Sequence, residues 1–334
     1  MSSQTKTIAV IGATGNQGFS TAESFLSIPN WAVRALTRNP DSATAQKLAS
    51  MGCEVVQADL NDMSSLDTAF KGVHAIFVNT DFWATYTSDP ARDSFAAYAQ
   101  EVRQGKNAAI AASKVPSLER FVYSALPSFS KASGGKYSKA LHCESKAAIV
   151  EYIETSRDLI ELAKKSSFIY LGAYSTHPIF TPRSLSEDGV YQFIIHVRPV
   201  AKIPIIDAPS STGRFVKELV LNEEPGTKLL AYDTDSYLSV LEAVEVWSRR
   251  TGEKAEIITI SAEEMRERFG IPMEVLDAPL AIDEFGYMSG VEGYIEPKDL
   301  TSTVVTRSFE EWLNTRDWRE LALAGEKELE GVKI

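Results

Sequence analysis

Short apolar runs alternate with segments of helical periodicity along the first half of the chain. Uninterrupted apolar runs are typical of parallel strands covered on both faces, and the helical segments between them would form right-handed crossovers. We therefore predict an α/β fold with a Rossmann-type, doubly wound parallel sheet. The predicted strands are 8–11, 32–37, 54–58, 74–79, 120–124 and 168–171; the predicted helices lie at 16–26, 42–51, 64–70, within 92–113, and around 142–153.

The second half continues the alternation less regularly. An apolar strand at 203–206 and a helix at 212–221 are expected to return to the first domain, which spans residues 1–174. The remainder, 175–202 and 223–334, is expected to form a smaller mixed α/β C-terminal domain. Its predicted elements are 228–232, a helix at 239–251, a strand at 255–260 and a helix at 262–269.

Three glycines follow the first strand at once. Gly12 permits a tight turn, Gly15 lets backbone N–H groups approach a diphosphate, and Gly18 lets the next helix pack closely on the strand. The helix N-terminus offers free amides and the positive end of its dipole to the anion. The order of strand, glycine loop and helix predicts a dinucleotide site that includes Gly12, Thr14, Gly15, Asn16, Gln17 and Gly18.

The end of the second strand indicates which dinucleotide is preferred. An NAD-selective site would place a carboxylate here for the ribose 2′-hydroxyl, but Arg38 stands 20 residues after Gly18 and no acid precedes Asp41. A guanidinium can pair with a 2′-phosphate that a carboxylate would repel. We therefore predict NADP(H) as the cofactor; the alternative is an arginine that only faces solvent.

Polar residues also follow the other predicted strands. Ligands of a doubly wound sheet bind at the carboxyl ends of its strands, so Asp59, Asn79, Thr80 and Ser124 should lie along one edge. Asp59 and Leu60 are placed to contact the adenine, although Asp59 can equally cap the next helix. Residues 81–90 hold three aromatics in a predicted loop at this edge, which either walls a substrate pocket or packs on the following helix.

A possible catalytic group follows in the helix after Ser124. His142 and Lys146 are four residues apart and so share a helix face. A lysine beside the nicotinamide ribose can hold its hydroxyls and lower the pKa of a neighbouring proton donor, while Ser124 can orient a substrate oxygen. Tyr137 is a second possible donor. In the alternative interpretation, Lys146 only binds cofactor and His142 is inert.

These motifs resemble the NmrA-like branch of the atypical short-chain dehydrogenases. The resemblance covers nearly the whole chain, although most of its specificity lies before Tyr174. It rests on Gly12-x-x-Gly15-x-x-Gly18, Thr37-Arg38-Asn39-Pro40, Val122-Tyr123-Ser124-Ala125-Leu126, His142-x-x-x-Lys146 with Tyr152, and Ser308-Phe309-Glu310-Glu311-Trp312-Leu313.

The resemblance implies an NADP(H)-preferring Rossmann domain with a smaller C-terminal domain as one wall of the cleft. It also implies backbone contacts to the nicotinamide side from Gly172 and Tyr174. Short-chain dehydrogenases that reduce carbonyls use Tyr-x-x-x-Lys, and here His142 occupies the tyrosine position. Histidine can act as a general acid near neutral pH, so this departure is compatible with turnover.

The composition of the chain limits which classes of binding partner and which cellular compartment we expect. Up to Tyr170 there are 17 Lys and Arg against 16 Asp and Glu, and after it 17 against 29, so the acidic carboxyl half disfavours direct nucleic-acid binding. No apolar run is long enough to span a membrane, and no spacing of His, Cys, Asp or Glu resembles a metal site. Two cysteines and the absence of a signal sequence predict a soluble protein of the cytoplasm or nucleus.

Two functions remain open. One is an NADPH-dependent reductase of a small carbonyl, imine or activated alkene, with Lys146, His142 or Tyr137, and Ser124 as its catalytic groups. The other is a non-catalytic, redox-sensing regulator that binds NADP(H) and a protein partner. Both types occur in the family that the sequence resembles.

Overall fold

The computed structural model describes residues 5–317, and its largest element is a seven-stranded sheet. Every neighbouring pair in this sheet is parallel, in the order β11-β6-β5-β4-β1-β2-β3. The strand order reverses between β1 and β4, which makes their carboxyl ends a topological switch point. The predicted doubly wound sheet is confirmed. Its strands are β1 (Lys6–Ile11), β2 (Trp31–Thr37), β3 (Glu54–Gln57), β4 (Ala75–Val78), β5 (Arg120–Ala125), β6 (Ser166–Leu171) and β11 (Lys228–Ala231).

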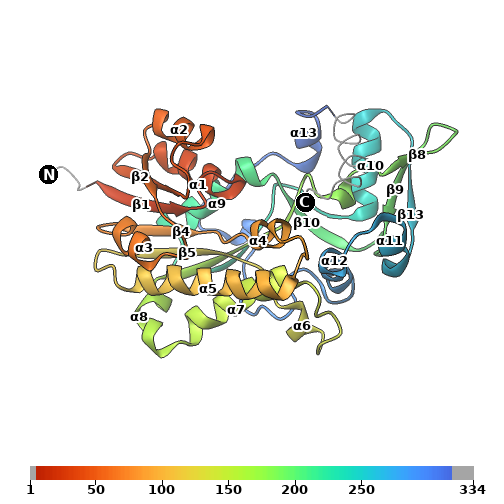
Figure 1. Cartoon of the computed structure of the whole chain (residues 1–334). Helices are drawn as coiled ribbons and strands as arrows, with labels where there is room; N and C mark the ends of the chain where they lie inside the picture. The colour runs from red at the N-terminus through yellow and green to blue at the C-terminus, as the bar shows by residue number, and fades with distance from the viewer. Residues whose placement is uncertain (1–4, 318–334) are drawn as a thin grey trace.

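Helices cover both faces of the sheet (Figure 1). One face carries α1 (Asn16–Leu26), α2 (Ala43–Ser50) and α9 (Ala208–Leu221), and the other carries α3 (Met63–Ala69), α5 (Ser94–Ser113), α7 (Leu141–Thr155) and α8 (Ile160–Ala163). Successive residues of β1 face opposite sides, because Ile8 and Val10 pack toward α1 while Ala9 and Ile11 pack toward α5. This two-sided burial explains the uninterrupted apolar runs.

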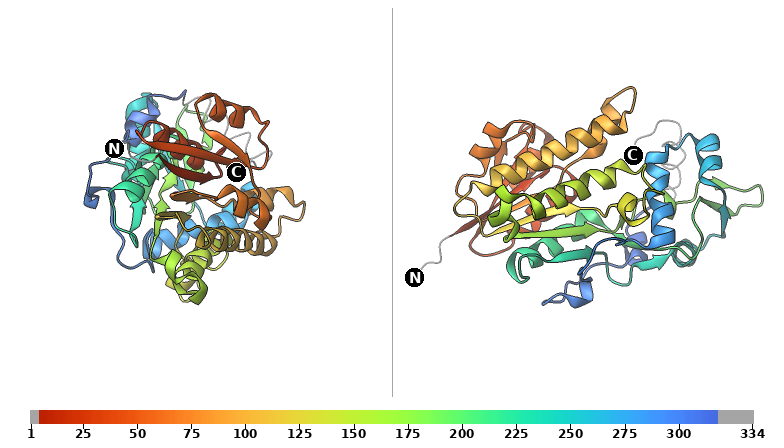
Figure 2. Two further views of the ribbon diagram at one scale, coloured as in Figure 1. Left: turned by 90° about the vertical axis from the view of Figure 1, so that its left-hand side faces the viewer. Right: turned by 90° about the horizontal axis from the view of Figure 1, so that it is seen from below.

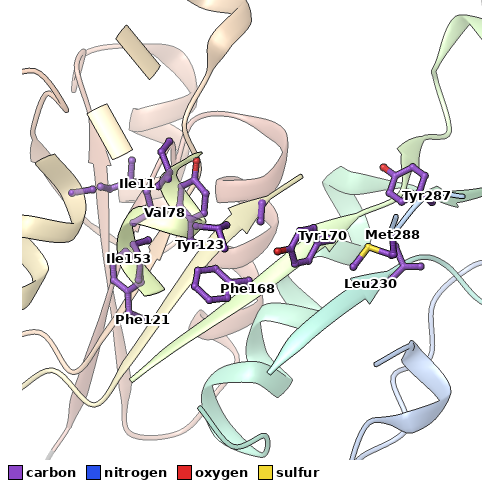
Figure 3. Close-up of a cluster of buried hydrophobic side chains, with 14 of the residues drawn as sticks. Ile11, Val78, Phe121, Tyr123, Ile153, Phe168, Tyr170, Leu230, Tyr287 and Met288 are labelled. Atoms are coloured by element: carbon purple, nitrogen blue, oxygen red, sulfur yellow. The ribbon is translucent and has the colours of Figure 1, made fainter. Parts of the chain in front are cut away.

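The core under α5 and α7 brings two helices close together. Large side chains of β5 and β6, including Phe121, Tyr123 and Phe168, fill this side of the sheet (Figure 3). On α5 the facing residues are small: a Cβ added at Gly105 would lie 2.4 Å from Cδ1 of Ile149 on α7. The Ile149 side chain therefore packs directly on the α5 backbone at Gly105, and this close packing positions the polar residues one turn away on each helix.

The rest of the chain forms two small mixed sheets and a group of helices at the carboxyl side of the large sheet (Figures 1 and 2). One sheet has the order β12-β10-β7 and the other β13-β9-β8. The strands are β7 (Ala173–Tyr174), β8 (Ser184–Leu185), β9 (Tyr191–Ile195), β10 (Lys202–Ile206), β12 (Tyr237–Ser239) and β13 (Ala255–Thr259). The helices are α6 (Phe129–Ala132), α10 (Val240–Thr251), α11 (Ala262–Phe269), α12 (Met273–Phe285) and α13 (Phe309–Leu313), with short 3-10 turns η2 (Pro178–Phe180) and η3 (Pro297–Asp299). A further 3-10 turn, η1 (Arg157–Leu159), lies between α7 and α8 and packs on α5.

Two expectations about the path of the chain are corrected. Residues 228–232 were expected in the smaller lobe, but β11 pairs with β6 and forms the edge of the large sheet. Residues 203–222 were expected to return together to the first domain. Helix α9 packs on α1 so closely that a Cβ added at Gly213 would lie 2.0 Å from the Ser20 carbonyl oxygen. β10, in contrast, pairs in a small sheet.

The expected aromatic loop at 81–90 is largely a helix, α4 (Phe82–Ser88). Asp81 caps it by accepting the N–H of Ala84. Phe82 and Tyr86 are buried together against Ala97 of α5, so packing on the following helix was the correct alternative for these two rings. Within residues 5–317, no helix has both the length and the apolar character that crossing a bilayer requires.

Candidate active site

The glycine loop lies at the switch point between β1 and β4. Gly12 has φ +70, in the left-handed region, and a Cβ added there would lie 3.4 Å from the carbonyl oxygen of Asn79. A Cβ at Gly18 would lie 2.2 Å from the Gly12 oxygen, so this position has no room for a side chain. Gly15 is the N-cap of α1 and supplies no side-chain cap, while Gly15 and Asn16 are exposed and Thr14 is half-buried. The loop thus leaves a shallow cradle of backbone amides open to an anion.

Arg38 stands exposed just beyond β2, at the same edge of the sheet. Gln57 fixes its backbone by donating to the Arg38 carbonyl oxygen at 3.1 Å. Within the described residues the Arg38 guanidinium has no ion-pair or hydrogen-bond partner, whereas Arg34 on the same strand is bound to Glu54 and two carbonyl groups. The donors of Arg38 are therefore available to an external anion.

Gln17 and Tyr174 are brought together from α1 and β7. The Gln17 side-chain amide donates to the Tyr174 hydroxyl at 2.9 Å. Its carbonyl oxygen Oε1 is buried and lacks a partner among the described residues, which is costly unless a ligand or water donates to it. Together with the amide cradle and the free guanidinium, this orphaned oxygen fits a bound dinucleotide.

Asp59 and Leu60 each accept a hydrogen bond from within the protein. Asp59 accepts the backbone N–H of Asn61 at 2.8 Å, and α3 is capped by Asp62 instead. The capping alternative for Asp59 was therefore wrong. The carbonyl oxygen of Leu60 accepts the side-chain amide of Asn107, which ties this loop to α5.

Lys146 is buried in a polar network that the sequence did not indicate. Its Nζ donates to the Thr80 carbonyl oxygen at 2.8 Å, to the Thr80 hydroxyl at 3.1 Å and to Glu101 Oε1 at 2.9 Å. Glu101 on α5 is 1% exposed and also accepts hydrogen bonds from Thr80 and Ser145. An ammonium group has three protons, so this arrangement uses all of them within the protein.

Tyr123 and Ser124 complete the neighbourhood of Thr80. The Tyr123 hydroxyl lies 2.9 Å from the Thr80 hydroxyl, and burial followed by the Glu101 charge raises the pKa of Tyr123 well above its usual value. Tyr123 therefore stays protonated. The Ser124 hydroxyl, at the buried end of β5, has no hydrogen-bond partner within residues 5–317 and is available to a ligand.

His142 is paired with a second buried carboxylate. Glu274 Oε1, on α12, lies 2.9 Å from the His142 backbone nitrogen and 2.7 Å from its Nδ1, and both groups donate to it. The rings of Trp83 and Phe82 on α4 lie 4.9 and 6.0 Å from the imidazole. Each member of the His142-x-x-x-Lys146 pair is thus held by a carboxylate from a different helix.

The remaining candidates are engaged in local structure. Tyr137 donates its hydroxyl to Glu284 at 2.6 Å, and burial together with Glu284 raises its pKa, so it is a poor proton donor as it stands. Gly172 donates its N–H to the Ala231 carbonyl, and a Cβ there would lie 2.5 Å from the Pro204 oxygen. This glycine therefore allows β6 and β10 to pass close to each other.

Over residues 4–313 the sequence matches the NmrA-like family. The chain belongs to this family. It is 29% identical over 282 residues to an NmrA-like family domain-containing oxidoreductase of Aspergillus hancockii, covering 81% of this chain and 80% of the relative. It is 30% identical over 257 residues to another such oxidoreductase from Cladobotryum sp, covering 74% of each.

Solved structures share the fold of this NmrA-like chain. A crystal structure of NmrA, a negative transcriptional regulator, in complex with NAD has a TM-score of 0.66 at 21% identity and covers 99% of this chain and 98% of its own. An NADPH-dependent quinone oxidoreductase from Escherichia coli, complexed with NADPH, has a TM-score of 0.67 at 20% identity and covers 92% of this chain and 98% of its own. The two neighbours have the same fold, although one is named a regulator and the other an enzyme.

Two hollows on the NmrA-like chain lie away from the predicted cofactor residues. One, of about 390 Å³, is lined by residues such as Lys6, His74 and Glu119 at the amino ends of the strands. The other, of about 710 Å³, lies between α10 and β13 and is lined by Leu241, Val244 and Ile257 among others. Neither contains a residue of the glycine loop or of the His142-x-x-x-Lys146 pair.

Proposed function

We propose that the chain is an NADPH-dependent reductase of a small, mostly apolar carbonyl, imine or activated alkene. The observation that carries this proposal is the glycine cradle at the switch point, with the unpaired Arg38 at the end of the next strand. Membership of the NmrA-like family and the oxidoreductase names of its relatives support it. A dihydronicotinamide would supply the hydride, and the protein's own residues would bind, orient and protonate.

Each site residue has a proposed role. The amides that follow Gly12 would hold the diphosphate, and Arg38 would pair with the 2′-phosphate and so favour NADP(H) over NAD(H). Gln17 and Tyr174 would border the nicotinamide end, where the orphaned Gln17 oxygen can accept a hydrogen bond from the cofactor. Ser124 would orient the substrate oxygen or nitrogen. The C-terminal elements α12 and η2 would form one wall of the substrate cleft.

Of the two proton donors considered, His142 fits the role better than Tyr137. The Tyr137 hydroxyl already donates to a carboxylate, Glu284, whereas the His142 ring binds a carboxylate, Glu274, through Nδ1 and has the Cys143 sulfur as its other side-chain hydrogen-bond partner. Lys146 would lie behind the nicotinamide ribose and act through its positive charge, or exchange its contact with Thr80 for a ribose hydroxyl.

One observation favours a second function, a redox-sensing regulator that binds a protein partner. All three protons of Lys146 are used by Thr80 and Glu101, so binding a ribose hydroxyl would require one of these contacts to break. A lysine held in this way can serve structure alone. The regulator would require different affinities for oxidised and reduced cofactor, because a ligand shifts a conformational equilibrium only through differential binding.

A panel of carbonyl, imine and enone substrates, followed by the loss of NADPH absorbance, tests the two functions against each other. The reductase is expected to consume NADPH with at least one class, and Lys146→Ala is expected to lower the rate. If the variant keeps the full rate, the assigned site is wrong. If the protein binds NADP(H) tightly, distinguishes its oxidation states and consumes no substrate, the regulator replaces the reductase.

A further inference from the structure

Glu274 holds His142 through a single oxygen. The backbone N–H of His142 and its ring Nδ1 both donate to Oε1, at 2.9 and 2.7 Å, so the start of α7 and the imidazole are fixed together. The contact joins α12 to α7 across 132 residues of sequence. Only 3% of the Glu274 side chain is exposed, compared with 16% of the His142 side chain, so the carboxylate is the inner member of the pair.

This contact decides which ring nitrogen can meet a substrate. The carboxylate requires a proton on Nδ1, because an ionised carboxylate can only accept hydrogen bonds. Nε2 is then the ring nitrogen that Glu274 does not engage. Trp83 and Phe82 flank the ring from α4, at 4.9 and 6.0 Å between centroids, which restricts its rotation. Packing and a hydrogen bond thus fix both the tautomer and the orientation of the ring.

The charges around the ring keep it protonated. Burial alone would lower the pKa of His142, but the Cys143 sulfur and the Glu274 carboxylate outweigh burial and raise the pKa to about 10. The second oxygen of Glu274, Oε2, is buried and has no hydrogen-bond partner within the described residues. The positive charge of the imidazolium therefore compensates the buried negative charge of the carboxylate. The titratable groups that face the pair from the packed elements are Cys143 on α7, Tyr86 on α4, Asp277 on α12 and His177 at the start of η2.

We propose that Glu274 is a positioning residue for catalysis: it holds His142 as an imidazolium whose Nε2–H replaces the tyrosine hydroxyl of ordinary short-chain dehydrogenases as the proton donor. This proposal rests on the reductase function proposed above. The dihydronicotinamide of NADPH, the reductant, transfers a hydride with its electron pair to the electrophilic carbon of the substrate. The Nε2–H bond breaks, and the proton forms a new bond to the substrate oxygen or nitrogen, or to the α-carbon of an activated alkene. A neutral imidazole remains, with its Nδ1–H still bound to Glu274, until solvent reprotonates Nε2.

The first test uses the protein without cofactor or substrate. The sequence has four histidines, so the imidazole resonances of His142 can be assigned by NMR with single substitutions and followed from pH 5 to 10.5. In the unmodified protein His142 is expected to remain protonated through neutral pH, with a pKa near 10. In Glu274→Gln the midpoint is expected to fall by more than about one pH unit, because the charge and the charge-assisted hydrogen bond of Glu274 are lost, while burial and the Cys143 sulfur continue to act on the ring.

Asp277→Asn is the matched control. Asp277 lies one turn further along α12, is equally buried at 4%, and accepts the backbone N–H of Lys139 at 2.6 Å instead of a histidine ring. Its substitution disturbs the same helix but is expected to leave the His142 midpoint within about one pH unit. A His142 midpoint at or below 6.5 in the unmodified protein overturns the proposal, even if Glu274→Gln does not fold.

The second test uses kcat over the same pH range, with whichever substrate the panel identifies. A donor with a midpoint near 6.5 keeps its proton in only about one molecule in 30 at pH 8, so a Glu274→Gln protein that titrates there is expected to lose about 30-fold in kcat at pH 8 and much less at pH 6, with KM little changed. A smaller fall in the midpoint gives a correspondingly smaller loss, still confined to the higher pH values. A loss independent of pH would mean that Glu274 is only structural. If no substrate is consumed, the reductase fails, while the titration still decides whether Glu274 sets the charge of His142.

Discussion

The ion pair of Glu101 and Lys146 makes the strongest prediction for stability. Glu101 is 1% exposed and accepts hydrogen bonds from Lys146, Thr80 and Ser145. Glu101→Ala removes the carboxylate and leaves the Lys146 ammonium group with only the two oxygens of Thr80 as hydrogen-bond partners. Only 11% of the Lys146 side chain is exposed, so water replaces little of the lost contact. Removing one partner of a buried pair costs about 3–5 kcal/mol, because the remaining charge is buried without compensation.

Urea unfolding of the cofactor-free protein measures this cost. Glu101→Ala is expected to lower the unfolding midpoint at an unchanged m-value, corresponding to about 3–5 kcal/mol. The matched control is Asp67→Ala, which breaks the exposed pair of Lys114 and Asp67, with side chains 53% and 44% exposed. This control is expected to cost less than about 1 kcal/mol, because water screens the pair.

The double variant Glu101→Ala/Lys146→Met separates lost charge compensation from lost packing. Methionine fills similar space to the lysine stem without the ammonium group, so much of the lost stability is expected to return. The reasoning is refuted if Glu101→Ala costs no more than the Asp67→Ala control, or if adding Lys146→Met makes the protein less stable still.

Three further predictions concern the cofactor and pH. Arg38→Ala is expected to weaken NADPH binding by about 10-fold in a fluorescence titration while NADH binding changes little, since only NADPH carries the 2′-phosphate; equal losses for both would remove Arg38 from the site. Gly18→Ala is expected to abolish dinucleotide binding in the same titration, because its Cβ would lie 2.2 Å from the Gly12 oxygen, and unaltered binding would contradict the described loop. Burial, together with the positive charge of Arg183, lowers the pKa of His177 to about 4, so the unfolded chain binds more protons between pH 6.5 and 4 and stability is expected to fall as pH falls through that window. His177→Asn keeps an acceptor for the Ile179 N–H and is expected to reduce this dependence in urea midpoints from pH 7 to 4; the part that remains comes from His196, whose pKa burial also lowers to about 4, and an unchanged slope would mean that His177 does not titrate in this way.

Sequence patterns within a short stretch of chain were sufficient to predict helix α1 and the strands of the large sheet. The helix predicted at 16–26 is α1 (Asn16–Leu26), because the glycine loop fixes where it begins. The predicted strands of the large sheet appear within two residues at each end. In the central strands β1, β4, β5 and β6 this is because burial on both faces requires an apolar run. Helix α4 was missed because residues 81–90 were interpreted as a loop under both alternatives, a pocket wall or packing on the following helix, although Asp81 is an ordinary N-cap residue.

The two carboxylates of the site could not be found by spacing. Glu101 lies 45 residues before Lys146, and Glu274 lies 132 residues after His142, so neither pair leaves a local pattern. A weaker signal was present on α5, where Glu101 falls in the stripe of small residues Ala97, Gly105 and Ala108 that faces the core. A charged residue on such a stripe requires a partner, because a buried charge without one is costly. The identity of that partner requires the fold.

The placement of β11 at the edge of the large sheet has a consequence for how this protein can be divided. The chain leaves the sheet after β6, forms β7 to β10 of the small sheets and helix α9, and then returns to pair four residues of β11 with β6 before it completes the small sheets with β12 and β13. A fragment cut after residue 174 would therefore expose β6 as an open, apolar edge and would also lack α9 against α1, the combination that promotes aggregation. Exchanging carboxyl-terminal segments between relatives to alter specificity therefore requires keeping residues 208–221 and 228–231 with their original sheet.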